Sequence, residues 1–269
     1  MRLAKDQGLS LTGPDGLLKH GGRRGRGGPT GHRGPPVRAR TSGGGRGTAR
    51  PALNGRNQQV DRFAPQSLPG WIMSTRARFS RPTVFGQFEV TVYNKDGSFL
   101  FAITRGDLPA DDLLVRVQSP CLFGESFGVN SCDCGAQLTE ALRIGAQQPN
   151  FLLVYLSNQE GRGLGLFQKV KLIEVEANQN VGMMEAFDIL GLPLDIREYR
   201  SASEMIRDLN GDRAIRLMTN NPKKVDGLTA GGINISERVP LLVDPPNEAC
   251  RAYLRAKKEN LGHILPHLD

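Results

Sequence analysis

Residues 151–169, FLLVYLSNQEGRGLGLFQK, join a short apolar run to a glycine-rich loop and the start of a helical segment. The run from Phe151 to Leu156 has the length of a buried strand, and a helix is predicted from about Leu164 to Glu176. Backbone N–H groups at such a loop can bind an anion, and Arg162 can bind a phosphate through two hydrogen bonds. The loop could equally be a plain strand-to-helix connection, since that connection also calls for glycine.

The flanking sequence continues the alternation of strands and helices. It predicts helices at 137–146, 201–209 and 223–231, and strands at 113–118 and 214–219. From residue 83, the segments TVFGQFEVTVY and GSFLFAIT alternate apolar and polar residues around a turn at 94–97, which predicts an antiparallel hairpin. We therefore expect an α/β fold, with a mixed sheet flanked by helices and antiparallel strands at its N-terminal side.

Composition divides the chain near residue 72. The first 70 residues hold 13 Lys and Arg against 3 Asp and Glu, with 16 of the 33 glycines, whereas the other residues hold 22 against 24. Nearly all of the net charge of +8 is therefore local. With Phe63 as its only aromatic residue, this stretch cannot bury enough apolar surface to offset its ordering entropy. We expect a disordered Gly/Arg-rich tail at 1–72 and one catalytic domain at 73–269.

The same composition bears on partners and location. Arg/Gly segments can bind RNA phosphates, but the segment 21–56 lacks aromatic residues for base stacking, so we do not expect a nucleic-acid partner. No run approaches the roughly 18 apolar residues of a membrane span, and Met1 does not begin a secretory signal. We expect a cytoplasmic protein without a membrane partner.

Three of the four cysteines form a C-x10-C-x-C pattern, at Cys121, Cys132 and Cys134. Cys250 lies more than a hundred residues further on, and the four histidines lie near the chain ends. Structural zinc sites close with four protein ligands, whereas catalytic zinc sites keep one position open. Three clustered thiols without a nearby fourth ligand therefore predict one open zinc site per chain. The alternative is a set of small buried core cysteines.

Two further segments carry polar residues suited to chemistry. IRLMTNNPKKVDGL (215–228) places Thr219 and Lys224 after a strand, where α/β sheets bind ligands, although Asn221 and Pro222 also form a favoured helix start. GLPLDIREY (191–199) predicts a loop in which Asp195 stands two residues before Arg197. These two side chains could face one pocket or form a surface ion pair.

Taken together, these segments resemble the GTP cyclohydrolase II family over about residues 110–266. The resemblance rests on CLFGESFGVNSCDCGAQL, NQEGRGLGL, LGLPLDIREY, RLMTNNPKKVDGL, GINISERVPLLV and NEACRAYLRAKKENLGHIL. It implies a zinc-dependent hydrolase of riboflavin biosynthesis that acts on C–N bonds in cyclic amidines. Such an enzyme opens the imidazole ring of a purine nucleotide and releases formate and pyrophosphate.

The resemblance also assigns roles to residues. The three clustered cysteines would hold zinc, whose bound water attacks C8 of the guanine. Arg197 matches the nucleophile toward the α-phosphorus, and Asp195 matches the proton acceptor. The nucleotide would be held by Arg116, Gln137, Glu160, Gly161, Arg162, Thr219 and Lys224. Magnesium would bridge the triphosphate oxygens, and the family implies a homodimer.

Several positions depart from the family pattern. Gln118 replaces a histidine, Ser131 an arginine, Ile173 a catalytic tyrosine and Met183 a nucleotide-binding threonine. These changes leave two alternatives open: a paralogue acting on another nucleotide, in uracil catabolism or a specialised purine-derived pathway, or a non-catalytic nucleotide-binding protein. The presence of both Asp195 and Arg197 favours an enzyme. Because Ile173 cannot transfer a proton, we expect weaker GTP turnover than in an ordinary family member.

Overall fold

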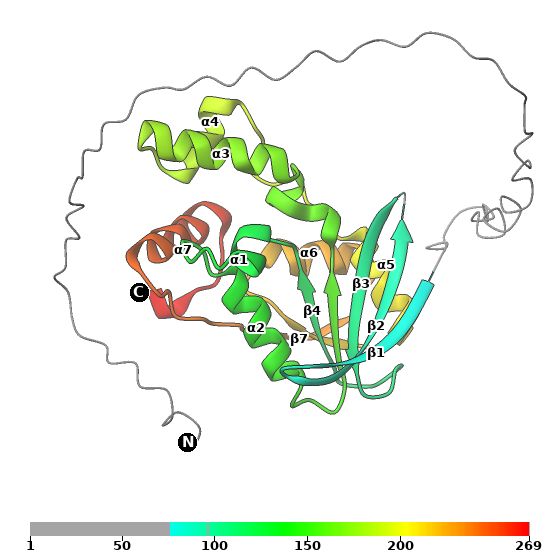
Figure 1. The fold of residues 1–269 in the computed structure, drawn as a ribbon. Coiled ribbons are helices and arrows are strands. Elements are labelled where there is room, and N and C mark those ends of the chain that lie inside the picture. Colours follow the sequence, from blue (N-terminus) through cyan, green and yellow to red (C-terminus); the bar gives the residue numbers. More distant parts are fainter. Residues whose placement is uncertain (1–75, 96, 269) are drawn as a thin grey trace, which may run out of the picture. The chain divides into compact units, whose positions relative to one another are not determined.

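The computed structural model describes residues 76–95 and 97–268, so the predicted tail at 1–72 lies outside the described residues. Seven strands form one sheet in the order β1-β2-β3-β5-β4-β6-β7 (Figure 1). They are β1 (Arg76–Thr83), β2 (Gly86–Lys95), β3 (Ser98–Arg105), β4 (Leu113–Gln118), β5 (Phe151–Tyr155), β6 (Ile215–Met218) and β7 (Ile235–Val239).

The sheet is antiparallel on one side and parallel on the other. The pairs β1–β2, β2–β3 and β3–β5 are antiparallel, whereas β4 pairs in parallel with both β5 and β6, and β6 with β7. The four parallel strands therefore end at the same edge of the sheet, where the loops after β4, β5 and β6 come together. In α/β sheets, this edge is where ligands bind.

Helices cover both faces of the sheet. They are α1 (Leu122–Ser126), α2 (Cys134–Gly145), α3 (Leu166–Gln179), α4 (Met183–Leu190), α5 (Arg200–Asn210), α6 (Pro222–Ala230) and α7 (Glu248–Leu261). Phe151 and Leu153 pack with α2 on one face, whereas Leu152 and Val154 pack with α5 and α6 on the other (Figure 1). With both faces covered, all six residues of β4 are buried, as is typical of central parallel strands.

The structure confirms the predicted α/β class and its mixed sheet. The predicted strands at 113–118, 151–156 and 214–219 correspond to β4, β5 and β6, with ends that differ by at most one residue. None of the helices in the described part of the chain is long and apolar enough to cross a membrane.

Five of the helices and strands were not predicted from the sequence: β1, β7, α1, α4 and α7. β1 is exposed along its whole length, and β7 includes the exposed Ser236 and Glu237, so neither shows the apolar alternation of a half-buried strand. Both lie at an edge of the sheet, where only one neighbouring strand provides hydrogen bonds. Their formation depends on that neighbour more than on their own composition.

Candidate active site

A cavity of about 530 Å³ lies at the sheet edge where the parallel strands end. Its walls come from β4, from the loops after β4, β5 and β6, and from α2, α3 and α7. The residues predicted from the sequence that line it are Arg116, Cys121, Cys132, Cys134, Gln137, Gly161, Arg162, Arg197, Thr219 and Lys224. The fold therefore brings together five segments that are distant in the sequence.

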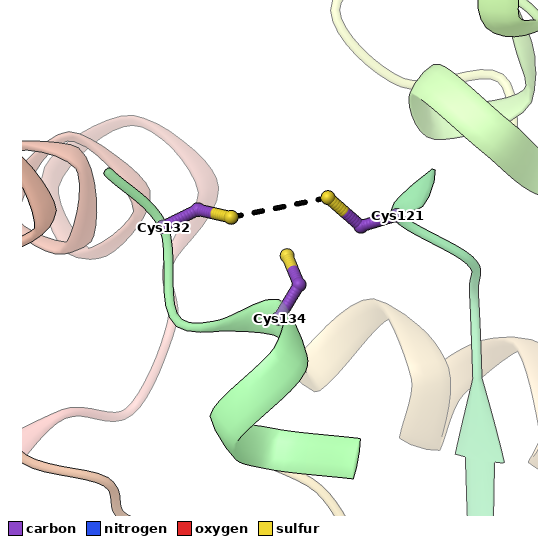
Figure 2. A group of neighbouring side chains, drawn as sticks. All are labelled: Cys121, Cys132 and Cys134. Carbon is purple, nitrogen blue, oxygen red and sulfur yellow. Dashed lines mark hydrogen bonds between the residues drawn. The ribbon is translucent and has the colours of Figure 1, made fainter. Parts of the chain in front are cut away.

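The three clustered cysteines point toward one another (Figure 2). Cys121 follows β4, Cys132 lies in the loop before α2, and Cys134 begins α2. Their sulfur atoms all lie within 4.8 Å of one another, and Cys121 Sγ is 3.8 Å from Cys132 Sγ. Hydrogen bonds with the other two thiols, together with Lys169, hold the pKa of Cys121 below its usual range.

Two glycines let the cysteine-bearing segments approach closely. A Cβ on Gly135 would lie 2.1 Å from the carbonyl oxygen of Gly124, and a Cβ on Gly124 would lie 3.0 Å from Cys132 Sγ. Only glycine allows α1 and the start of α2 to pack at this distance. The glycine that follows Cys134 therefore helps to form the cysteine cluster.

This donor set fits zinc. Tetrahedral zinc with bonds of about 2.3 Å to sulfur places its sulfur ligands about 3.8 Å apart, which agrees with the separation of Cys121 and Cys132. Cys250 belongs to a separate apolar cluster with Leu254 and Leu265. Among the described residues no fourth protein ligand joins the three thiols, which corresponds to the open kind of zinc site predicted from the sequence.

Lys169 and Glu160 connect the cysteine loop to the glycine-rich loop. Lys169 Nζ lies 3.0 Å from Cys121 Sγ and 2.6 Å from Glu160 Oε1. Glu160 Oε2 accepts a hydrogen bond from the backbone N–H of Leu122, at 2.9 Å. Both oxygens of Glu160, which the family resemblance places at the nucleotide, are thus engaged by protein groups here.

A chain of hydrogen bonds crosses the floor of the cavity. Arg116, buried on β4, donates to Gln137 Oε1 at 2.7 Å and to Gln118 Oε1 at 2.9 Å. Gln118, where the family has histidine, donates in turn to Glu125 at 2.7 Å. Gln137 donates to the buried Asp133. These bonds fix the Arg116 guanidinium, whose pKa burial lowers to about 10.

Two cations, one from the glycine-rich loop and one from the start of α6, line another part of the cavity. Lys224 is buried, its Nζ donates to the carbonyl oxygen of Val117 at 2.6 Å, and burial holds its pKa well below the usual range. Arg162 adopts a left-handed backbone conformation with φ of 59°, and its guanidinium lies 5.2 Å from the ring centre of Phe187. Arg162 Nη2 donates to Met183 Sδ at 2.6 Å, so the methionine sulfur engages one nitrogen of this cation.

Asp195 and Arg197 form a bidentate ion pair, with Arg197 Nε and Nη2 donating to the two carboxylate oxygens at 2.8 and 2.6 Å. Burial opposes ionisation of Asp195, but the hydrogen bonds and charge of Arg197 outweigh it and lower the pKa of Asp195. Arg197 lines both the main cavity and a second one of about 580 Å³, whereas Asp195 lines only the second. The pair therefore lies between the two cavities.

All four departures from the family pattern line the main cavity: Gln118, Ser131, Ile173 and Met183. Ile173 is 43% exposed and offers only aliphatic carbon where the family has a phenol. The substitutions therefore lie where a bound molecule would be contacted, and they change the chemistry of its walls.

The residues of the site that were not predicted from the sequence include Asp133, Lys169, Tyr253, Lys257 and His263. Lys257 Nζ donates to Asp133 Oδ1 at 2.8 Å across 124 residues of sequence. Asp133 stands between two ligand candidates in the C-D-C motif, which could have suggested a role for it. The sequence of α7 belongs to a segment that carries the family resemblance, but no residue of this helix was assigned to the site from it.

Comparison with known proteins identifies one family, which is the family that the sequence motifs resemble. The family model described as GTP cyclohydrolase II matches residues 75–240. A GTP cyclohydrolase-2 of Streptomyces coelicolor is 45% identical over 190 residues, which are 70% of this chain and 85% of the relative. Riboflavin biosynthesis proteins RibBA of Chlorobium phaeovibrioides and Bacillus subtilis are 41% and 43% identical over 68% of this chain. This chain spans about half the length of these two, 45% and 46% respectively.

Proposed function

The chain belongs to the GTP cyclohydrolase II family, and from this membership we propose that it opens the imidazole ring of GTP, releasing formate and pyrophosphate, as a step of riboflavin biosynthesis. The observation that carries this proposal is the single cavity that joins the cysteine cluster to Arg162, Arg197, Thr219 and Lys224. One end of this cavity suits a metal, and the other suits phosphates.

Cys121, Cys132 and Cys134 would hold the zinc. When bound, zinc lowers the pKa of a coordinated water toward about 7 and so supplies hydroxide for a weakly electrophilic aromatic carbon. Lys169 supports this end of the site through its contacts with Cys121 and Glu160. Arg116, held by Gln118 and Gln137, would contact the nucleotide beside the cysteines.

At the other end, Arg162, Thr219 and Lys224 would bind the triphosphate, and magnesium bound with the nucleotide would offset part of its negative charge. Arg197 uses Nε and Nη2 to bind Asp195 and, within the described residues, has no hydrogen bond at Nη1. This nitrogen would face the α-phosphate, and Asp195 would accept a proton from the guanidinium. A protonated guanidinium has no electron pair with which to attack, so it would lose a proton as its nitrogen bonds to the α-phosphorus and pyrophosphate leaves. Asp195, which raises the pKa of Arg197 against the effect of burial, is the carboxylate in contact with that guanidinium.

A second candidate function follows from the side chains of Ile173 and Met183. Both are apolar residues in the wall of the cavity where the family pattern has hydroxyl groups. A site that keeps its phosphate and metal ends but changes these contacts would act slowly on GTP, or act on a related purine nucleotide. Formate retained on a ring-opened product would also indicate a changed reaction.

Incubation of the zinc-loaded protein with a panel of nucleoside triphosphates tests the proposal. Formate, pyrophosphate and ultraviolet absorbance are followed separately. The proposal expects both products from GTP and requires zinc for formate release. Release of neither product from any purine nucleotide would refute the enzymatic function, and preference for another nucleotide would support the second candidate.

We also infer a homodimer, from the family resemblance alone. Light scattering coupled to size-exclusion chromatography tests it. A mass near 29.3 kDa, that of one chain, at micromolar concentration would contradict the inference.

A further inference from the structure

Helix α7 forms one wall of the cavity, although the family model ends at residue 240. The residues of α7 that line the cavity include Ala249, Ala252, Tyr253, Ala256 and Lys257. Their spacing of three and four residues places them on one face of the helix. Three of the five are alanines, so among these residues only Tyr253 and Lys257 have long side chains.

Two hydrogen bonds fasten α7 to the cysteine loop. Asn247, which caps the start of α7, donates to the carbonyl oxygen of Asn130 at 3.1 Å. Lys257 Nζ binds Asp133 Oδ1 at 2.8 Å, and these two side chains are only 12% and 3% exposed. Tyr253 lies between the two attachments. Its ring centre is 4.4 Å from Lys257 Nζ, which holds the ring in place by a cation–π contact.

Tyr253 differs from the other three tyrosines of the chain. Tyr93 donates to Asp208 and Tyr155 to Glu125, while Tyr199 is part of the apolar core. All four tyrosines lie in the described part of the chain, and Tyr253 alone lines the main cavity. Within the described residues its hydroxyl forms no hydrogen bond. A polar group on a cavity wall is thus left for a bound molecule.

The charges around Tyr253 locate it within the site. Burial raises its pKa above the usual value, opposed by the nearby cations Lys257 and Arg162 and reinforced by Cys134 and Asp133. The phenol is therefore protonated at neutral pH and can donate a hydrogen bond. Its neighbours also show that it lies within electrostatic range of both the cysteine cluster and the phosphate-binding arginine.

We propose that Tyr253 contacts the substrate directly, with its hydroxyl donating a hydrogen bond to the nucleotide between the purine ring and the phosphates. The adjacent alanines leave room for the planar base, and Ile173 on α3 provides apolar contact with it. This inference rests on the proposed function, because it takes the occupant of the cavity to be a purine nucleotide.

The test is Tyr253→Phe in the full-length, zinc-loaded protein. Phenylalanine keeps the ring and its contact with Lys257 and removes only the hydroxyl. We expect kcat/KM for GTP to fall about 10- to 100-fold, as for loss of a hydrogen bond to a polar or charged partner. Zinc content and melting temperature should stay at their wild-type values, which separates a substrate contact from a structural role.

Tyr93→Phe is the matched control, because it also removes one tyrosine hydroxyl but lies outside both cavities. It should leave kcat/KM for GTP unchanged. Wild-type kcat and KM in Tyr253→Phe would overturn the inference.

If the wild-type protein does not turn over GTP, the dissociation constant for GTP with magnesium, measured by calorimetry, decides the role of Tyr253. Binding at least fivefold weaker in Tyr253→Phe supports the contact even though the proposed reaction has failed. Equal dissociation constants overturn the contact. A wild-type protein that binds no GTP would refute both proposals.

Discussion

At the scale of single residues, the four cysteines fall into two environments. Cys121, Cys132 and Cys134 converge on one point, whereas Cys250 packs among leucines. We expect Cys132→Ser and Cys134→Ser each to lose most bound zinc, because serine is a poor zinc ligand at neutral pH. Metal analysis of the purified variants measures this.

Cys250→Ala is the control for these variants, since it removes a buried thiol outside the cluster. It should keep about one zinc per chain. Full occupancy in both serine variants would exclude the proposed ligands. Loss of metal should also lower the melting temperature, because zinc binding to the folded chain contributes to its stability.

Arg197 also acts as a single residue, because its planar guanidinium binds Asp195 through two parallel bonds. We expect Arg197→Ala to reduce pyrophosphate release from GTP by at least about 10³-fold while zinc remains bound, since phosphoryl chemistry depends on such groups. Arg197→Lys should recover little, because an ammonium group cannot form the same bidentate pair.

Pyrophosphate release and zinc content are measured on the same samples of these variants. Normal pyrophosphate release by Arg197→Ala would remove Arg197 from the proposed mechanism.

At the scale of elements, the packing of α1 against the start of α2 determines the shape of the metal site. An alanine at position 135 would place its Cβ 2.1 Å from the backbone oxygen of Gly124, and backbone on both sides cannot move away cheaply. We expect Gly135→Ala to reduce the free energy of unfolding by about 1–3 kcal/mol. It should also reduce zinc content, because the segments that carry Cys121 and Cys134 must separate.

Gly182→Ala is the matched control, because nothing lies within 4 Å of a Cβ at that position and its backbone φ of −76° suits alanine. Denaturant unfolding and metal analysis compare the two variants. If Gly135→Ala has the stability and zinc content of Gly182→Ala, the close approach of α1 and α2 is not required for the site.

At the scale of the whole molecule, the partly buried His263 links stability to pH. Burial and the nearby cations Lys257, Arg197 and Lys224 lower its pKa from 6.5 to about 3, while Asp133 has the opposite, smaller effect. Between these two pH values the unfolded chain binds a proton that the folded chain excludes, so acidification favours unfolding. The contribution of His263 to stability is complete above about pH 6.5 and is progressively lost as the pH falls toward 3.

We expect His263→Gln to flatten this dependence, with a difference of about 1–3 kcal/mol in the pH-induced loss of stability between pH 7 and 4. Denaturant unfolding of both proteins across this range measures it. Acid also releases thiolate-bound zinc from both proteins, so the difference between their profiles isolates the histidine. Parallel profiles would contradict the expectation.

The N-terminal 72 residues also concern the whole molecule, and they lie outside the described residues. From their composition, we expect a chain beginning at Met73 to keep the melting temperature and GTP turnover of the full chain. Calorimetry and formate release measure the two. A drop of several degrees, or submicromolar RNA binding by the full chain at physiological salt, would show that this segment has a role we have not assigned.

Local signals in the sequence were sufficient for the α/β class, for strands β4 to β6 and for the three cysteines that converge. Apolar runs, glycine-rich loops and cysteine spacing act over a few residues, so they are visible without the fold. The roles of the individual site residues and the expected weak GTP turnover stay predictions.

Only the tertiary structure showed that Lys257 binds Asp133, that Lys169 binds Cys121 and that Tyr253 lines the cavity. α7 is polar and lacks a binding motif, and its position depends on contacts with a loop more than a hundred residues earlier in the chain. Such contacts form only when the sheet has brought the strand ends together. Packing between distant segments leaves no periodic pattern in the sequence, and this is why these contacts became visible only in the folded molecule.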